Sequence, residues 1–387
     1  MGKLTFYEEI DNYMSIKIDL LSEEFKHALD NVSSQTLQDF LNETSLSSNL
    51  RRQNSKKEHI SNLSKAYKDE ELVLVLGAGV SVPYKIPGWG NLLQKLLFET
   101  FNNSSANNDA QFVLSKLFPE LFPNSPLISA RFLEEYFKKK KNGKTFEEMV
   151  KEALYEQINR EADSPTIKEI LQFCIAPGRS PNLDSIITYN YDDILEGALF
   201  NSDVEIPFKP IYKVGMNPTN GELPIYHVHG YLPQEQEIDS DYSITLSENL
   251  YHKQYNDIYS WNNIVQINKF KDNVCVFIGT SLTDPNIRRL LDIAMLQKGD
   301  NQKYHYLFKM RYNPKDVERN LEELLSRNTP LLNEKNKADL KLAETSKQLL
   351  EKMEEFEELD AKSFGIKIIW IRDYNEIAEF LKEVRTN

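Results

Sequence analysis

The chain has 387 residues, of which 40% are hydrophobic, so it is long enough to bury one large core or a core with a smaller module. Acidic residues number 59 against 46 lysines and arginines, and the resulting net charge of −13 argues against bulk binding of nucleic acid. The sequence holds two cysteines, Cys174 and Cys275, which are too few for a disulfide framework or a four-cysteine zinc site. We expect both to be small buried side chains.

The N-terminus shows no pattern of export or lipid attachment. Glu8 and Glu9 stand where a signal peptide needs apolar residues, and Phe6 stands where the myristoylation pattern needs Ser or Thr. The longest apolar runs are far shorter than the roughly 20 residues that span a bilayer. We therefore expect a soluble, cytoplasmic protein without a membrane segment.

Three parts are predicted along the chain. Residues 1–68 are predicted to form a helical N-terminal extension, because apolar residues recur there at helix spacing. Residues 69–310 form the main domain, with a helical insertion at about 91–180, and residues 311–387 supply a C-terminal helix and strand that complete or flank its sheet. Lysines 138–141 indicate either a solvated helix end or a contact for an acidic partner or nucleic acid.

Strand-like and helical segments alternate from residue 71 onward. The strands are expected at 71–76, 185–189, 225–229, 274–278, 305–308 and 366–371, and the helices between them at 192–200, 249–270, 286–297 and 338–359. This alternation predicts an α/β fold, a Rossmann-like doubly wound parallel sheet with ligands at the carboxyl ends of its strands.

The first motif, Gly77-Ala78-Gly79-Val80-Ser81, follows a predicted strand. Glycines at such a position let backbone N–H groups approach a pyrophosphate, and a following helix adds partial positive charge. The third glycine of the dinucleotide fingerprint is missing, because Val82 occupies its position. A tight structural turn therefore remains an alternative.

A second motif contains Pro87, Gly88, Trp89 and Gly90. This rigid aromatic loop either folds over a bound ligand or begins a helix with Trp89 packed into the core.

The third motif places Thr188, Asn190 and Asp192 where a strand ends and a helix begins. A carboxamide such as that of Asn190 can hold both a hydroxyl group and a water molecule, so we expect it to contact the ligand. Asp192 and Glu196 are also explained by structural roles, Asp192 as a helix cap.

The segment from Ile225 to Gly230 contains His227 and His229, which a continuous strand would place on the same face. Histidine titrates near neutral pH, and we expect His229 to act as a general base. A purely structural pair and a metal site remain alternatives, although the sequence offers no identifiable third metal ligand.

The last motif is a glycine turn at Gly279, Thr280 and Ser281, where we expect the second half of a dinucleotide to bind. The next helix is expected to begin with Asp284 as its cap and Pro285 in its first turn. Capping alone would explain Asp284.

Taken in order, these motifs resemble the sirtuin-like (SIR2-like) domains, specifically the bacterial anti-phage branch that degrades NAD⁺. The resemblance spans roughly residues 70–310 and implies that Asn190 orients ribose and water while His229 activates a ribose hydroxyl. It further implies that NAD⁺ is bound by Gly77, Ala78, Gly79, Ser81, Pro87, Trp89, Thr188, Asp192, Gly279, Thr280 and Ser281. Because the chain lacks the four-cysteine zinc module of deacetylating sirtuins, water is the expected acceptor and no metal is expected.

The resemblance to stand-alone members implies activation by assembly, as a homo-oligomer and with a HerA-type hexameric ATPase. Leu342, Leu349 and Phe356 recur every seven residues and predict either an interface or a packed core face. Two other functions remain open, a catalytically silent NAD-sensing module and an NAD-dependent protein deacylase or ADP-ribosyltransferase.

Overall fold

The computed structural model describes residues 27–28, 34–43, 51–101, 108–121, 125–140, 143–175, 182–238, 244–299, 303–327 and 341–387. The helical pattern expected between Tyr7 and Phe25 lies outside these residues. The chain divides into two compact units, a terminal unit of residues 1–58 and 309–372 and a main unit of residues 59–308 and 373–387. These two units do not test the predicted division into three parts, which stays a prediction.

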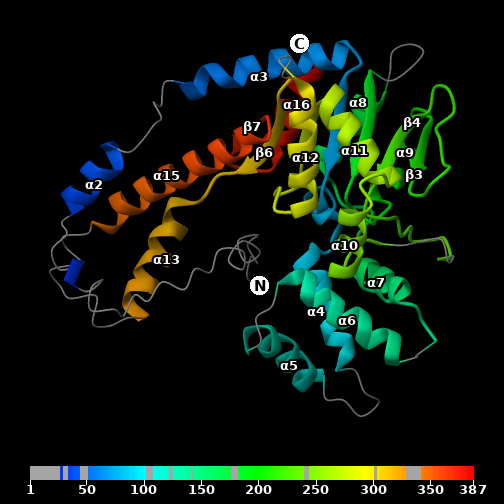
Figure 1. Cartoon of the computed structure of the whole chain (residues 1–387), viewed down its shortest axis with the longest axis horizontal. Helices are drawn as coiled ribbons and strands as arrows, with labels where there is room; N and C mark the ends of the chain where they lie inside the picture. Colours follow the sequence, from blue (N-terminus) through cyan, green and yellow to red (C-terminus); the bar gives the residue numbers. More distant parts are fainter. Residues whose placement is uncertain are drawn as a thin grey trace. The chain divides into compact units, whose positions relative to one another are not determined.

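The described strands form one seven-stranded sheet with the order β3-β4-β2-β1-β5-β6-β7. Figure 1 labels strands β3, β4, β6 and β7 of this sheet. Their bounds are β1 Leu72–Leu76, β2 Leu183–Thr188, β3 Phe208–Ile211, β4 Leu223–His227, β5 Val274–Ile278, β6 His305–Met310 and β7 Ile366–Ile371. The pairings of β1 with β2 and β5, of β4 with β2 and β3, and of β5 with β6 are parallel. The doubly wound α/β fold expected from the alternating segments is confirmed.

Strand β1 lies within the sheet and all five of its residues are buried, which explains its unbroken apolar sequence. Strand β3, in contrast, was not predicted. It is four residues long, contains Pro210 and Lys209, and lies at an edge of the sheet. Proline cannot donate a ladder hydrogen bond and is tolerated at such an edge, so this strand lacks the apolar run by which the others were identified.

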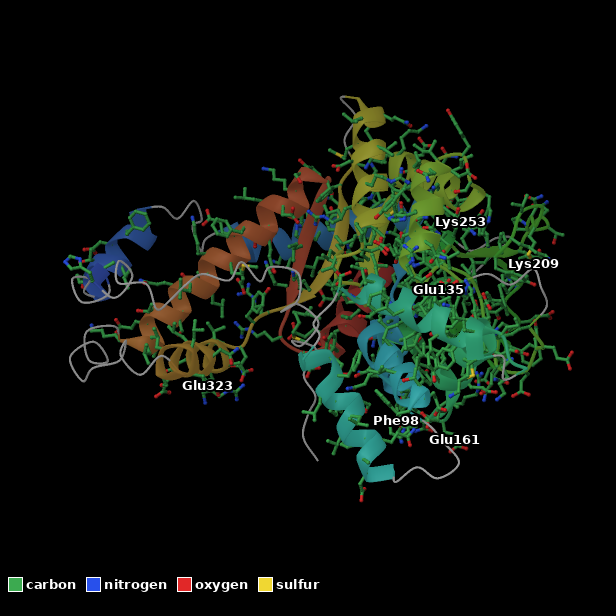
Figure 2. The ribbon with its side chains drawn as sticks, turned by 60° about the horizontal axis from the view of Figure 1, so that its bottom comes forward. Phe98, Glu135, Glu161, Lys209, Lys253 and Glu323 are labelled. Atoms are coloured by element: carbon green, nitrogen blue, oxygen red, sulfur yellow. The ribbon has the colours of Figure 1, made fainter. Side chains whose placement is uncertain are left out.

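Between β1 and β2 the described chain is helical, in agreement with the predicted insertion. It contains α4 Trp89–Thr100, α5 Asn108–Leu121, α6 Pro126–Lys140, α7 Phe146–Tyr155 and α8 Pro165–Cys174. Helices α4, α6 and α7 share a buried cluster that includes Leu96, Leu133 and Val150. Figure 2 labels Phe98 on α4 and Glu135 on α6, two helices that pack against each other.

Five further α-helices of the main unit are described. They are α9 Ile194–Phe200, α10 Glu248–Asn256, α11 Trp261–Asp272, α12 Pro285–Lys298 and α16 Asn375–Thr386. Helix α8 packs against α9 and α16, and α11 packs against α12. The single helix expected over 249–270 was wrong in one respect, because residues 257–260 interrupt it and separate α10 from α11.

The described part of the terminal unit includes α2 Ser34–Glu43, α13 Pro314–Arg327 and α15 Leu342–Ser363, and α3 Arg51–Lys68 runs from this unit into the main unit. Helix α15 packs against α2, α13 and β7. Leu349 and Phe356 are 42% and 55% exposed. The described residues therefore do not bury these two side chains, whereas the packed core face considered for their seven-residue spacing would need them buried. No helix in the described ranges combines the length and the apolar character needed to cross a membrane.

Candidate active site

Four neighbouring strands end at one level of the sheet, and each of them leads into one of the motifs identified in the sequence. Leu76, the last residue of β1, is paired with Thr188 of β2 on one side and with Ile278 of β5 on the other. Thr188 is in turn paired with His227, the last residue of β4. The segments that follow carry the two glycine turns, Asn190 and His229, so the parallel register brings all four motifs to one edge.

The two glycine turns contact each other through their backbones. The N–H of Gly77 donates to the carbonyl of Ile278 at 2.9 Å, and the N–H of Gly79 donates to the carbonyl of Gly279 at 2.9 Å. A Cβ atom at Gly77 would lie 2.6 Å from the oxygen of Gly279, and one at Gly79 would lie 2.7 Å from the Gly279 Cα. This contact requires glycine at both positions whether or not a ligand binds. A tight structural turn is therefore enough to explain why Gly77 and Gly79 are glycines.

The chain after Gly77 departs from the expected turn into an α-helix. Two short 3₁₀ segments, η2 Ala78–Val80 and η3 Val82–Tyr84, follow instead, and the next α-helix begins only at Trp89. The expected contribution of an α-helix N-terminus directly after the first glycine turn is therefore wrong. The residues of this turn can still offer backbone N–H groups to an anion, but without a helix dipole behind them.

Trp89 begins α4 and packs against the buried cluster of the helical insertion. This position agrees with the interpretation in which the tryptophan belongs to a helix start beside the core. Its Nε1 atom is buried and has no hydrogen-bond partner among the described residues, however, and buried polar atoms are seldom left in that state. Pro87, two residues earlier, is partly exposed.

Asn190 belongs to a buried hydrogen-bond network with Ser81 and Asp192. The Asn190 Nδ2 atom donates to the hydroxyl of Ser81 at 3.2 Å, and that hydroxyl donates to Oδ1 of Asp192 at 3.0 Å. The backbone N–H of Asn190 also donates to the hydroxyl of Thr188 at 3.1 Å. The network links the first glycine turn to the segment after β2, so four predicted site residues contact one another.

Asp192 combines this role with the structural one considered from the sequence. Its Oδ1 atom accepts a hydrogen bond from the backbone N–H of Ile194 at 3.1 Å, where α9 begins. The pKa of Asp192 is raised to about 6, chiefly by burial and to a smaller extent by the nearby acids Glu196 and Asp193, while the hydrogen bonds from Ile194 and Ser81 oppose the shift.

His227 contacts both Glu196 and the backbone of Asn190. Its Nε2 atom lies 2.7 Å from Oε1 of Glu196, and its Nδ1 atom lies 3.2 Å from the backbone carbonyl of Asn190. Both histidine nitrogens therefore have partners, and the structural role expected for Glu196 is consistent with this contact. Sequence reasoning did not foresee that His227 would hold the Asn190 backbone.

His229 has different surroundings, and the expected common face of the two histidines is wrong. Strand β4 ends at His227, so the alternation that would have aligned the two rings does not continue. The His229 ring lies edge-on to the rings of Tyr189, at 4.8 Å between centroids, and of Tyr251, at 5.7 Å. His227 instead contacts Glu196 of α9.

The His229 imidazole is buried, with 5% of the residue exposed, and its Nε2 atom has no hydrogen-bond partner among the described residues. Burial lowers the pKa of His229, while the carboxylate of Asp284, 3.9 Å from Nε2, raises it. Burial thus favours the neutral imidazole, which is the form that a general base requires.

The second glycine turn is held in an unusual backbone conformation. Gly279 has a φ of 70°, and the buried Leu282 has a φ of 57°, in the left-handed region that costs a residue with a side chain energy. Thr280 is partly buried and Ser281 is exposed, with its hydroxyl 2.8 Å from that of Thr283. Asp284 caps α12 as predicted, accepting from the N–H groups of Asn286 and Ile287.

No group of three or more histidine, cysteine, aspartate or glutamate residues able to hold a metal ion occurs in the part of the chain that the structure describes. Cys174 and Cys275 are both buried free thiols, as expected, and burial raises the pKa of each thiol.

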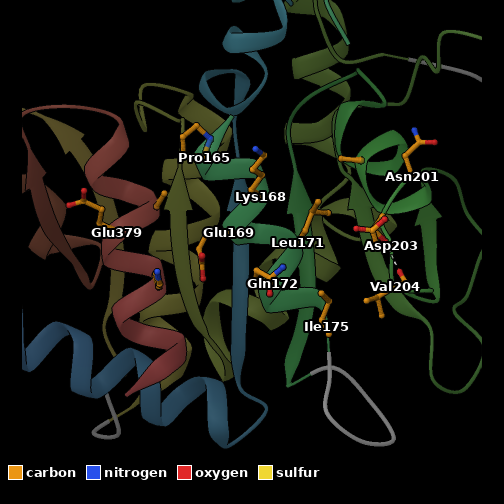
Figure 3. A pocket seen from close by; sticks show the side chains of 14 residues that line it. Pro165, Lys168, Glu169, Leu171, Gln172, Ile175, Asn201, Asp203, Val204 and Glu379 are labelled. Atoms are coloured by element: carbon orange, nitrogen blue, oxygen red, sulfur yellow. Dashed lines mark hydrogen bonds between the residues drawn. The ribbon is translucent and has the colours of Figure 1, made fainter. Parts of the chain in front are cut away.

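A separate pocket of about 620 Å³ lies between α8, α9 and α16 (Figure 3). Lys168, Glu169 and Gln172 reach it from α8, and Asp203 and Glu379 from the other two sides. None of its lining residues belongs to the motifs at the strand ends, so it is distinct from the candidate site.

Comparison with known proteins finds two similarities. A model of the SIR2-like domain matches residues 184–330, the stretch that contains Asn190, His229 and the second glycine turn. The chain is also 22% identical, over 331 residues, to the NAD(+) hydrolase ThsA of Enterococcus faecium. That alignment covers 85% of this chain and 58% of ThsA, so the chain spans little more than half the length of that relative. The expected similarity to SIR2-like domains is thus confirmed for the stretch that supplies both candidate catalytic side chains.

Proposed function

We propose that this protein is an NAD⁺ hydrolase that cleaves the bond between nicotinamide and ribose, with Asn190 and His229 as its catalytic residues. One observation carries the proposal. Thr188 and His227 are paired across β2 and β4, and Asn190 and His229 each follow two residues later, so the amide and the imidazole leave neighbouring strands at the same level. Tyr189, next to Asn190 in the chain, touches the His229 ring.

The chemistry follows from what each group can do. When the nicotinamide-ribose bond breaks, its electron pair leaves with nicotinamide and the ribose carbon becomes electron-poor, so a nearby dipole lowers the barrier. The Asn190 amide can hold the ribose and the incoming water, whose oxygen bonds to that carbon while one of its O–H bonds breaks and the proton passes to the ribose oxygen that His229 has deprotonated. A neutral His229 can accept a proton from a ribose hydroxyl, and burial of the site limits access by other nucleophiles.

The remaining predicted residues surround this pair. The turn at Gly77, Ala78, Gly79 and Ser81 and the turn at Gly279, Thr280 and Ser281 meet at the carboxyl edge of the sheet and would receive the phosphates and the adenosine half of the substrate. Pro87 and the unpartnered N–H of Trp89 would lie on the nicotinamide side. Thr188 and Asp192 would hold Asn190 in place.

Release of nicotinamide from NAD⁺ by the purified chain tests the proposal. We expect Asn190→Ala and His229→Ala each to lower the rate by roughly 10²- to 10⁴-fold, the usual effect of removing a positioned donor or base. His252→Ala is the matched control, because His252 is an exposed histidine on α10, and we expect it to keep the wild-type rate. Equal rates in all four proteins would refute the site assignment.

The same assay separates the alternative functions. A catalytically silent NAD-sensing module would bind NAD⁺ without releasing nicotinamide. A transferase or deacylase would release nicotinamide only with a protein acceptor, and labelled adenine would then appear on that acceptor or on an acyl group. The chain has only two cysteines and so lacks the four-cysteine zinc module of deacetylating sirtuins, which supports water as the acceptor.

The biological setting is part of the same proposal. An enzyme that depletes NAD⁺ in defence against phage must be silent until it is triggered, and we infer that assembly supplies the trigger, through a homo-oligomer and a HerA-type ATPase. The exposed side chains of Leu349 and Phe356 on α15 are consistent with an interface. Measuring NAD⁺ consumption with and without such an ATPase, together with the mass of the purified protein in solution, tests this part.

A further inference from the structure

Asp284 stands at the first turn of α12 and uses its two carboxylate oxygens differently. Oδ1 caps the helix, accepting from the backbone N–H groups of Asn286 at 2.8 Å and Ile287 at 3.0 Å. Oδ2 takes no part in the cap. It accepts a hydrogen bond from the hydroxyl of Tyr251 at 2.5 Å and lies 3.9 Å from Nε2 of His229. Capping therefore accounts for the position of Oδ1 but not for the contacts of Oδ2 with Tyr251 and His229.

The other groups that face His229 carry no charge in their usual states. Tyr189 approaches the ring from the end of β2 and Tyr251 from α10, and burial raises the pKa of both phenols, so both stay neutral near pH 7. The backbone carbonyl of His229 accepts from the N–H of Thr245, whose own carbonyl accepts from the hydroxyl of Tyr191. Among the described residues, Asp284 is the acid whose carboxylate lies within 4 Å of a His229 ring nitrogen, and its charge raises the pKa of His229 against the effect of burial.

We propose that Asp284, fixed by Tyr251 and by the start of α12, is a positioning residue that orients the His229 imidazole and stabilises its protonated form. This inference rests on the proposed role of His229 as a base. At 3.9 Å the contact is an interaction between charges rather than a hydrogen bond, so it matters most at the moment when the imidazole acquires its proton.

The geometry also distinguishes the two ring nitrogens. Nε2 is the fully buried atom without a partner, and it is the nitrogen that faces the carboxylate. A proton on Nε2 therefore points toward Asp284 and leaves the lone pair on Nδ1, as a base needs. In the proposed step the O–H bond of a ribose hydroxyl breaks, its electron pair stays on the oxygen, and the proton bonds to Nδ1. The resulting imidazolium carries its positive charge beside the Asp284 carboxylate.

Two substitutions with opposite electrostatic effects test this inference. Asp284→Asn removes the charge but keeps the cap, because asparagine caps helices about as well as aspartate. We expect it to lower the pKa of His229, to move the acid limb of the kcat/KM profile for NAD⁺ to lower pH, and to reduce kcat by about 10- to 100-fold. Tyr251→Phe keeps the aromatic ring but frees Oδ2, and we expect it to raise the pKa of His229 and to move that limb to higher pH.

The titration of His229 can be followed without any enzymatic activity. In protein with ¹³C-labelled histidine, the imidazole signal that disappears in His229→Gln identifies this residue, and its midpoint is then measured in each variant. Asp292→Asn is the control, because it removes the same charge from an exposed position on α12, and its midpoint should equal that of the wild type. Opposite shifts in Asp284→Asn and Tyr251→Phe support the inference, even if NAD⁺ proves not to be the substrate. Unchanged midpoints overturn it, even in a chain that hydrolyses NAD⁺.

Discussion

The two sides of the candidate site differ in how completely the ring nitrogens of their histidines are bonded. On the Asn190 side, the Ser81 hydroxyl joins Asn190 to Asp192, and His227 uses both ring nitrogens, one on Glu196 and one on the Asn190 backbone. On the other side, the equally buried His229 has a ring nitrogen without a hydrogen bond and packs among aromatic rings.

This difference separates structural from functional evidence. A buried polar atom without a partner costs the fold roughly 1–3 kcal/mol, so it calls for an explanation such as a bound water, a ligand or a reaction. The Asn190 side could persist for stability alone, because its bonds connect β2, β4 and the first glycine turn. The His229 imidazole gains no hydrogen bond through Nε2 within the described residues, so stability alone explains it less well than it explains His227.

The largest effect on stability is expected from His227→Leu. Removing the imidazole leaves the carboxylate of Glu196 buried and without its partner, and breaking a buried pair in this way typically costs about 3–5 kcal/mol. Urea denaturation of the wild type and the variant measures the loss. Glu196→Gln with His227→Leu should recover part of the loss, because an amide is less costly to bury than a charge, and a double variant no more stable than His227→Leu would contradict the assigned contact.

A smaller effect, of opposite sign, is expected from Asp192→Asn. The pKa of Asp192 is raised from its usual 3.8 to about 6, so the folded chain holds this proton more tightly than the unfolded chain, and stability falls as the pH rises through that interval. The shift corresponds to a cost of about 3 kcal/mol above pH 6 as an upper value. Asparagine keeps an oxygen for Ser81 and Ile194 and cannot ionise, so the variant should gain stability at pH 7 and little at pH 4.

Urea denaturation at pH 4, 5, 6 and 7 measures this difference between wild type and variant. Asp203→Asn is the control, because Asp203 is exposed just beyond α9, and its difference from the wild type should stay small and independent of pH. If Asp192→Asn is equally destabilised at every pH, the carboxylate is needed for its hydrogen bonds rather than costly for its charge.

The sequence predicted which segments lie side by side better than it predicted the contacts between them. The parallel strands that precede Gly77, Asn190 and Gly279 were identifiable because buried strands have apolar runs and turns have glycines. The parallel register of the sheet then brings the three segments to one edge. The contact between the two glycine turns was not predictable, because it joins residues about 200 positions apart and neither turn shows by itself what its missing side chains make room for.

The histidines illustrate the same limit. The alternating pattern correctly placed His227 inside β4 but wrongly extended the strand to His229. The point at which a strand stops pairing with its neighbour depends on the rest of the sheet, so the local pattern did not show that β4 ends at His227. The sequence did not link Tyr251 or Asp284 to His229. Tyr251 was predicted to lie in one long helix over residues 249–270, and helix capping alone explained Asp284. Only the packing of α10 against α12 brings them to the ring.

The smallest effect on stability, and the sharpest test of the comparison, is expected from His229→Leu. The substitution removes the unpartnered Nε2 and the edge-on contacts with Tyr189 and Tyr251, and it adds apolar surface of similar volume, so gains and losses should cancel to within about 1 kcal/mol. Release of nicotinamide should nevertheless fall as far as in His229→Ala. A variant that folds as well as the wild type and does not turn over NAD⁺ would mean that the fold does not need this histidine and the reaction does. A loss of stability as large as that of His227→Leu would instead assign both histidines to the scaffold, and the difference between the two sides of the site would disappear.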